Sequence, residues 1–230
     1  MSIAENIALV RANIAQACAQ AGRPPEEITL VGASKMNDAA ACREAIAAGI
    51  DALGENRVQE MTAKLAENAY DGAPLHFIGH LQRNKVKQVV GKVALIQSVG
   101  SLELLEEIEK VAAARELVQD ILLEVNIGRE EAKSGFDPDA VTAAAEAALS
   151  LPHVRVRGLM TIPPADADRD TNMRYFQEVQ ALYVDINTKL FHNELEYLSM
   201  GMSGDFEDAI RCGANMVRVG SAIFGARHYT

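Results

Sequence analysis

The sequence predicts an α/β fold, a single-domain (β/α)8 TIM barrel that spans residues 1–230 and carries an additional N-terminal helix. Short β-branched or apolar runs alternate with helical stretches eight times along the chain. No stretch rich in proline and serine interrupts this alternation to mark a linker between two domains. The composition, with 49% hydrophobic and only 5% aromatic residues, suits Ala-rich helices packed on aliphatic strands.

The first predicted element is an amphipathic helix that precedes the alternation. Ile7, Val10, Ile14 and Ala17 recur at helical spacing and would share one buried face. Gly22, followed by Arg23-Pro24-Pro25, is expected to end this helix. The helix is therefore an addition to the eight strand-helix repeats.

The strands of the barrel are expected where short β-branched or apolar runs occur. They are residues 28–34, 52–54, 75–79, 94–99, 121–127, 154–162, 195–200 and 216–223. Eight parallel strands are the number that closes as a barrel. An open doubly wound sheet is the rival architecture, but the GxGxxG sequence expected after its first strand is absent.

Helices are predicted between these strands. They are expected at residues 38–48, 57–69, 101–118, 138–149, 171–190 and 205–212. Ser101 and Asp137-Pro138 are typical of helix starts, whereas Gly49 and Gly213 are typical of helix ends. The predicted starts and ends of the helices thus agree with the alternation of strands and helices.

Charge and cysteine content restrict the partners and the compartment. The chain has 22 Lys and Arg against 32 Asp and Glu, a net charge of −10, which would repel a nucleic-acid backbone. Cys18, Cys42 and Cys212 are odd in number and far apart, which favours neither disulfides nor a zinc site. Glu5 and Arg11 interrupt the first twenty residues, and no apolar run of about 18 residues occurs. We expect a cytoplasmic protein without a nucleic-acid, membrane or metal partner.

Lys35 is the first candidate for chemistry. It ends the first predicted strand, and barrel enzymes place catalytic groups at the carboxyl ends of their strands. One interpretation is a solvated lysine at the start of a loop, because lysines are seldom fully buried. The other is a Schiff-base lysine, since an apolar surrounding favours the neutral amine that attacks an aldehyde.

Two segments rich in glycine and serine follow the seventh and eighth predicted strands. Barrels often bind phosphate with these two loops, because small residues let backbone N–H groups approach the anion. Ser203, Gly204, Gly220 and Ser221 meet this requirement, although such glycines also serve ordinary turns. Arg218 lies two residues before Gly220, so on a strand it would point to the same face and into the site. A structural salt bridge is the alternative role for Arg218.

Other polar positions are weaker candidates. Asn56 follows the second predicted strand and could contact a ligand, but Asn at a strand end is often a turn residue. Lys133-Ser134-Gly135 could line the mouth of the barrel or form an exposed turn. His76 and His80 lie four apart in a strand-like segment, where this spacing does not make a metal pair.

Several segments together resemble the pyridoxal 5′-phosphate (PLP) homeostasis proteins, also called proline synthetase co-transcribed homologues. They are Gly32-Ala33-Ser34-Lys35, Gly54-Glu55-Asn56, His76 to Lys85, Lys133 to Phe136, Arg157 to Met160, Leu198 to Ser203 and Val217 to Gly225. The resemblance runs from about residue 5 to the C-terminus. It implies a fold-type III barrel similar to the N-terminal domain of alanine racemase.

The resemblance also implies roles for individual residues. Lys35 would hold PLP as a Schiff base, Arg218 would face the pyridine nitrogen, and Ser203, Gly220 and Ser221 would hold the phosphate. Gly204 departs from the pattern, because many relatives have an acidic residue there. A guanidinium at the ring nitrogen keeps that nitrogen unprotonated and weakens the ring as an electron sink. This argues against transaminase or decarboxylase chemistry and favours racemase-like proton exchange or simple carriage of the cofactor.

Three functions are compatible with these features. The first, which we expect, is a monomeric PLP carrier or regulator with little or no turnover that serves PLP and amino-acid homeostasis, with PLP, amino acids and PLP-dependent apoenzymes as partners. The second is an amino-acid racemase, but the tyrosine base of alanine racemases comes from a C-terminal β domain that does not follow Thr230. The third is a class I aldolase, in which Lys35 would form a Schiff base with a sugar phosphate.

Overall fold

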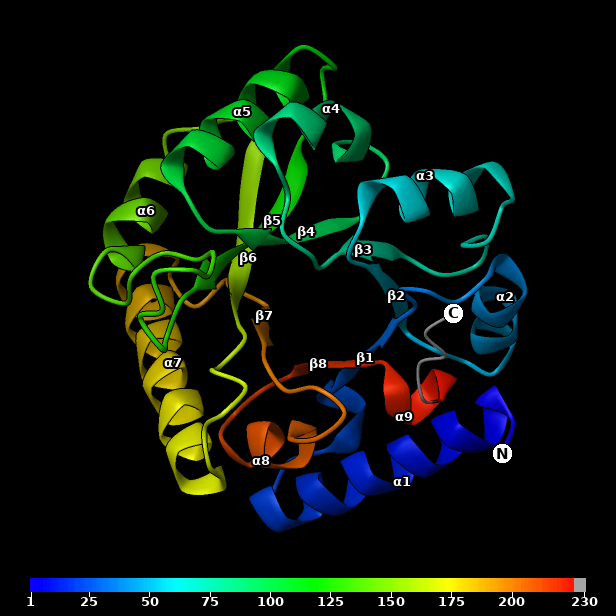
Figure 1. Ribbon diagram of the computed structural model, residues 1–230. Coiled ribbons are helices and arrows are strands. Elements are labelled where there is room, and N and C mark those ends of the chain that lie inside the picture. The colour runs from blue at the N-terminus through cyan, green and yellow to red at the C-terminus, as the bar shows by residue number, and fades with distance from the viewer. Residues whose placement is uncertain (226–230) are drawn as a thin grey trace. The chain divides into compact units, whose positions relative to one another are not determined.

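The computed structural model describes residues 1–225 and confirms the predicted fold class (Figure 1). Eight strands form a closed barrel in chain order, and the strand pairs with an assigned register are parallel. The chain divides into two compact units, Met1–His76 with the segment from Met200 onward, and Phe77–Ser199. The assignment of all residues to a single domain stays a prediction.

The strands lie close to their predicted positions. They are β1 (Thr29–Ala33), β2 (Ala52–Glu55), β3 (Leu75–Phe77), β4 (Leu95–Val99), β5 (Gln119–Val125), β6 (Val154–Thr161), β7 (Tyr197–Ser199) and β8 (Met216–Val219). The α-helices are α1 (Ile3–Ala21), α2 (Ala39–Ala47), α3 (Val58–Ala66), α4 (Val86–Val89), α5 (Leu102–Ala113), α6 (Val141–Ala148), α7 (Arg169–Leu190), α8 (Phe206–Arg211) and α9 (Ser221–Phe224). Two short 3-10 helices, Pro25–Glu27 and Arg83–Lys85, complete the elements of residues 1–225.

The first unit contains the N-terminal helix α1. Ser2 accepts the backbone N–H of Glu5, and Glu5 accepts the N–H of Ser2, which together form a capping box at its start. The predicted apolar face is buried, and α1 packs against α2, α8 and α9. Gly22 ends the helix with φ +67°, a left-handed conformation that glycine adopts without strain.

Three strands of the first unit bring its polar residues together. β1 pairs with β2 on one side and with β8 on the other, so that Val31 lies opposite both Ala52 and Arg218. Because the strands are parallel, the loops that follow β1, β2 and β8 emerge at the same end. This end carries Lys35, Asn56 and Gly220.

The second unit contains the run β4, β5, β6 and β7. Helices α5 and α6 contact β5 and β6, and α7 contacts β6. Gly158 on β6 pairs with Tyr197 on β7, and a Cβ atom at Gly158 would lie 1.7 Å from the Tyr197 carbonyl oxygen. Glycine is therefore required at this position for the two strands to approach.

Several predicted boundaries are wrong. The eighth strand ends at Val219, not Ile223, because Gly220 leaves the extended region with ψ −80° and its carbonyl accepts the N–H groups of Ile223 and Phe224. Residues 221–224 thus form the helix α9. The helix predicted from Pro138 begins at Val141, since the Asp137 carbonyl accepts the Ala140 N–H in a preceding turn. The short helix α4 was also not predicted.

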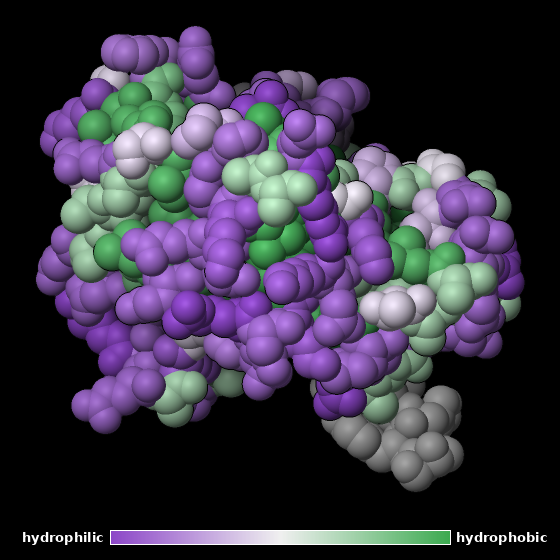
Figure 2. Space-filling model, turned by 90° about the horizontal axis from the view of Figure 1, so that it is seen from above, coloured by the Kyte–Doolittle hydropathy of each residue, from purple (hydrophilic) through white to green (hydrophobic). Residues whose placement is uncertain are grey.

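The surface shown in Figure 2 is mostly hydrophilic, with hydrophobic residues in groups between hydrophilic ones. Within residues 1–225, no helix combines the length and apolar character needed to cross a membrane. The same part of the chain contains no group of His, Cys, Asp and Glu side chains arranged for a metal ion.

Candidate functional site

Lys35 lies in a turn at the carboxyl end of β1. The N–H of Asn37 donates to the Ser34 carbonyl at 3.1 Å, which closes a four-residue turn with Lys35 and Met36 at its centre. The Lys35 side chain lines a cavity of about 220 Å³. The end of the first strand thus presents a lysine to a cavity.

Six of the seven predicted cofactor-binding residues line this one cavity, and all six belong to the first unit. They are Lys35, Ser203, Gly204, Arg218, Gly220 and Ser221. Ala33, Asn37, Met202, Phe224 and Gly225 complete the lining. Whether these residues bind a cofactor stays a prediction.

The loops after β7 and β8 are tied together by Ser203. Its Oγ accepts the N–H groups of Gly220 at 3.2 Å and of Ala222 at 3.4 Å. A Cβ atom at Gly220 would lie 3.3 Å from the carbonyl oxygen of Ala33, so glycine keeps this corner of the cavity open. Ser203, Gly220 and Ser221 form this wall of the cavity, in which the Gly220 and Ala222 N–H groups are bonded to Ser203 Oγ.

Arg218 projects from β8 into the same cavity and is only 3% exposed. Its backbone N–H donates to the Gly201 carbonyl at 3.0 Å, which fixes the strand against the loop after β7. The described residues that line the cavity include Lys35 and Arg218 but no carboxylate. This arrangement favours an anionic ligand.

Asn56 is the predicted site residue that does not line the cavity. It follows β2, and its Oδ1 atom is buried with no hydrogen-bond partner among the described residues. Lys133, Ser134 and Gly135 line a different cavity of about 290 Å³ in the second unit, where Ser134 Oγ donates to Glu124 Oε2 at 3.0 Å.

A larger cavity of about 640 Å³ lies at the amino end of β6 and is lined by Arg155, Arg157 and Glu196 among others. Barrel enzymes place their sites at the carboxyl ends of the strands. Arg157 is also engaged in ion pairs with Asp120 and Glu196. We therefore assign the candidate site to the smaller cavity beside Lys35.

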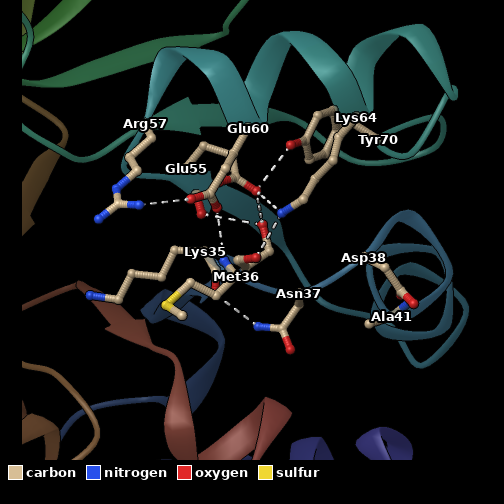
Figure 3. A network of polar contacts seen from close by, with 12 residues as sticks. Lys35, Met36, Asn37, Asp38, Ala41, Glu55, Arg57, Glu60, Lys64 and Tyr70 are labelled. Atoms are coloured by element: carbon tan, nitrogen blue, oxygen red, sulfur yellow. Dashed lines mark hydrogen bonds and ion pairs between the residues drawn. The ribbon is translucent and has the colours of Figure 1, made fainter. Parts of the chain in front are cut away.

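A buried polar network that the sequence did not predict lies between the Lys35 turn and α3 (Figure 3). Glu55, at the end of β2, is fully buried, and its Oε1 accepts hydrogen bonds from Ser34 Oγ at 2.6 Å, Lys64 Nζ at 2.6 Å and Tyr70 Oη at 3.0 Å. Lys64 Nζ also donates to the Ser34 carbonyl at 2.8 Å. Burial, followed by the Glu55 charge, raises the pKa of Tyr70, so its phenol remains a donor. The network holds Ser34 at both its hydroxyl and its carbonyl.

Helix α3 makes a second contact with the turn. Glu60 Oε2 accepts the Met36 N–H at 2.8 Å, and Asn37 Nδ2 donates to the Lys35 carbonyl at 3.0 Å. The Glu55-Asn56 segment was noted in the sequence only for Asn56. No local signal marks Glu60 and Lys64 as partners of the turn, because their spacing of four on α3 is equally typical of an exposed pair.

Comparison with known proteins identifies the family. Residues 6–228 match the family described as alanine racemase, N-terminal domain. The pyridoxal phosphate homeostasis proteins of Aquifex aeolicus and Pseudomonas aeruginosa are each 42% identical to this chain. The alignments cover 100% and 99% of this chain, and 100% and 97% of the respective relatives. The chain belongs to the pyridoxal phosphate homeostasis protein family.

Solved structures are similar to this family member over nearly its whole length. A protein of unknown function from Bifidobacterium adolescentis has a TM-score of 0.90 at 38% identity and covers 96% of this chain and 94% of its own. PipY of Synechococcus elongatus with PLP bound has a TM-score of 0.85 at 32% identity, over 97% and 100%. An alanine racemase of Clostridium difficile 630 shares the fold alone, with a TM-score of 0.72 at 17% identity over 58% of its chain.

Proposed function

We propose that this protein binds PLP as a Schiff base on Lys35 and contributes to intracellular PLP and amino-acid homeostasis with little or no turnover. One observation carries the proposal. Among residues 1–225, the cavity at the carboxyl ends of β1 and β8 is lined by an amine and a guanidinium and by no carboxylate, in a chain whose net charge is −10. A cofactor with an aldehyde and a phosphate is complementary to this lining. The PLP-bound PipY structure supports the choice of cofactor.

The wall at Ser203 fits the phosphate of PLP. Ser203 Oγ accepts two backbone N–H groups, which leaves its hydroxyl hydrogen to donate to an anion. Ser221 adds a second hydroxyl, and Gly204 leaves open space where a side chain would stand. We assign the phosphate to Ser203, Gly204, Gly220 and Ser221.

The other end of the cavity fits the ring. When bound, PLP supplies an aldehyde that condenses with an amine to give a Schiff base, and a pyridine ring that withdraws electrons. Arg218 is a donor that stays protonated in proteins, so facing the ring nitrogen it would donate a hydrogen bond and give up no proton. A ring held in this way withdraws electrons weakly, which supports low turnover. Asn56, whose buried Oδ1 has no partner among the described residues, is our remaining candidate for a polar contact.

Lys35, not Lys64, is the nucleophile in this proposal. The reacting amine must reach the aldehyde of a ligand in the cavity. Lys64 Nζ forms an ion pair with Glu55 at 2.6 Å and donates to the Ser34 carbonyl at 2.8 Å, and Lys64 is not among the described residues that line the cavity. Lys35, the residue after Ser34, points away from Lys64 in Figure 3, and it lines the cavity.

The proposal extends to partners and location. We infer that PLP-dependent apoenzymes and amino acids draw on the bound PLP, and that the protein acts as a monomer in the cytoplasm. Cys18, Cys42 and Cys212 are buried free thiols, which suits a reducing compartment.

Borohydride trapping tests the proposal. Purified protein is incubated with PLP, its absorbance spectrum is recorded, and the Schiff base is reduced and located by peptide mass mapping. We expect the adduct on Lys35 in the wild type and in Lys87→Ala, an exposed-lysine control, and its loss in Lys35→Ala. An adduct at the wild-type level on another lysine in Lys35→Ala would refute the assignment.

Low turnover is tested with the PLP-loaded protein and a panel of L-amino acids in deuterated water. Enzymes typically turn over about 1–1000 times per second, and we expect deuterium incorporation at the α-carbon far below that range. Exchange with chiral inversion at tens per second for any amino acid would make the protein a racemase.

A further inference from the structure

Met36, the residue after Lys35, has an unusual backbone conformation. Its φ is +63°, in the left-handed region that glycine and asparagine occupy readily and most other residues avoid. Met36 is the third residue of the Ser34–Asn37 turn, the position at which turns with positive φ usually carry glycine. Backbone strain of this kind persists where the surrounding structure enforces it.

Both ends of the Lys35–Met36 peptide are held by side chains. Glu60 Oε2 on α3 accepts the Met36 N–H at 2.8 Å, and Asn37 Nδ2 donates to the Lys35 carbonyl at 3.0 Å (Figure 3). Turn types differ chiefly by rotation of this central peptide through roughly half a turn. After such a rotation, the Met36 N–H would point away from Glu60. The Glu60 carboxylate therefore selects one of the two peptide orientations.

The residue before Lys35 is fixed independently. Ser34 is held at its hydroxyl by Glu55 and at its carbonyl by Lys64. Because Ser34 cannot shift, a rotation of the next peptide must be taken up by the backbone of Lys35 and Met36. The conformation of Lys35 thus depends on Glu60.

We propose that Glu60 is a positioning residue for Lys35: it holds the strained peptide after the lysine so that the amine is presented to the cavity before the ligand arrives. A group held in its bound conformation loses less freedom on binding, which raises affinity without a new contact to the ligand. The proposal rests on the Schiff-base function of Lys35 proposed above. Arg57 Nη1, 3.7 Å from Glu60 Oε1, supports the carboxylate from the solvent side.

Four variants test it. Glu60→Ala removes the acceptor, whereas Glu60→Gln keeps an oxygen that can accept the Met36 N–H. Met36→Gly combined with Glu60→Ala removes the acceptor but also the strain, because glycine adopts positive φ readily. Asp168→Ala is the stability control, since it deletes a helix cap at the Thr171 N–H of α7, in the other unit.

The first readout uses the protein without PLP. Amide hydrogen exchange of the peptide that contains Met36 should become faster in Glu60→Ala and stay at the wild-type rate in Glu60→Gln and Asp168→Ala. The second readout is the Kd for PLP. We expect it to rise about fivefold in Glu60→Ala, the effect of losing one typical hydrogen bond. It should change less than about twofold in Glu60→Gln and return toward wild type in the double variant.

The outcomes separate this inference from the proposed function. A wild type that forms no adduct on Lys35 would refute the proposed function, even if exchange at Met36 responds to Glu60. Unchanged exchange and PLP affinity in Glu60→Ala would overturn the positioning role. Equal losses in Glu60→Ala and Asp168→Ala would also overturn it, because they would reflect general stability.

Discussion

Glu55 and Lys64 should be strongly coupled energetically, and a double-mutant cycle measures this coupling. The pair is 2.6 Å apart, and the side chains are 0% and 8% exposed. Glu55→Gln leaves the Lys64 ammonium buried without an anion, and Lys64→Met leaves the Glu55 carboxylate without a cation. Removing one partner of a buried pair costs about 3–5 kcal/mol, so each single variant should lose roughly that much unfolding free energy.

The double variant Glu55→Gln/Lys64→Met should be more stable than the sum of the two losses implies. Both charges are gone, and the Gln oxygen can still accept from Ser34 Oγ and Tyr70 Oη, which donate to Glu55 at 2.6 and 3.0 Å. The remaining loss is mainly the bond from Lys64 to the Ser34 carbonyl, about 1 kcal/mol. Two losses of at least about 3 kcal/mol each, against about 1 kcal/mol for the double variant, give an expected coupling energy of at least about 5 kcal/mol.

The chain offers a control pair at the same separation. Lys189 Nζ and Asp185 Oδ1 on α7 are also 2.6 Å apart, but their side chains are 66% and 46% exposed. An exposed pair four residues apart on a helix contributes about 0.3–0.5 kcal/mol. Comparison of the two cycles therefore isolates the effect of burial.

Urea unfolding followed by circular dichroism supplies the free energies, with the slope compared among variants to check that the unfolded state is unchanged. A coupling energy for Glu55 and Lys64 below about 1 kcal/mol, like that of the exposed pair, would refute the reasoning. The network would then not act as a buried ion pair.

Three further predictions follow from single features. Ser203→Ala combined with Ser221→Ala should weaken PLP binding by roughly 1.5–3 kcal/mol for each hydrogen bond lost. Lys35 should still form its adduct at saturating PLP. An unchanged PLP affinity in a spectroscopic titration would place the phosphate elsewhere. Gly158→Ala should destabilise the protein by more than about 3 kcal/mol in urea unfolding, because its Cβ would lie 1.7 Å from the Tyr197 carbonyl oxygen; a loss below about 1 kcal/mol would contradict this. Burial lowers the pKa of His76 from 6.5 to about 4. As the pH falls, the unfolded chain therefore takes up a proton on His76 before the folded protein does. The unfolding free energy should fall by up to roughly 3 kcal/mol between about pH 6.5 and about pH 4. His76→Gln should flatten this dependence, and an unchanged pH profile in that variant would contradict it.

The sequence predicted the parts of the site that follow from strand ends. Lys35, Arg218 and Gly220 could be placed together because parallel strands of a barrel share a carboxyl end, and hydrophobic runs locate those ends. The end of β8 was misplaced because Ser221-Ala222-Ile223-Phe224 is a short apolar run, which suits a strand and a helix equally. Only the backbone turn at Gly220 shows that these residues form a helix and not the end of the strand.

The network behind Lys35 could not be predicted for a different reason. Glu60 and Lys64, four apart on a helix, are typical of an exposed ion pair, and Lys64 pairs instead with Glu55. Their partners in the Lys35 turn are Met36, 24 residues before Glu60, and Ser34, 30 residues before Lys64. Helix periodicity contains no information on contacts over such separations. The local pattern therefore favoured a solvated face where the fold buries a lysine.

The two lysines at this turn face different surroundings, since Lys35 lines the cavity and Lys64 contacts Glu55 and Ser34. A buried ion pair is seldom more stabilising than apolar residues of similar size, so stability alone is a weak reason for Glu55 and Lys64 to be buried beside Ser34. The pair does orient the backbone, because its hydrogen bonds fix the Ser34 hydroxyl and carbonyl, and Glu60 fixes the next peptide, between Lys35 and Met36. Lys64 Nζ contacts both Glu55 and the Ser34 carbonyl, and these contacts hold the start of the turn. Lys35, carried by that turn, lines the cavity, and in the function proposed above it is Lys35 and not Lys64 that reacts with the aldehyde of PLP.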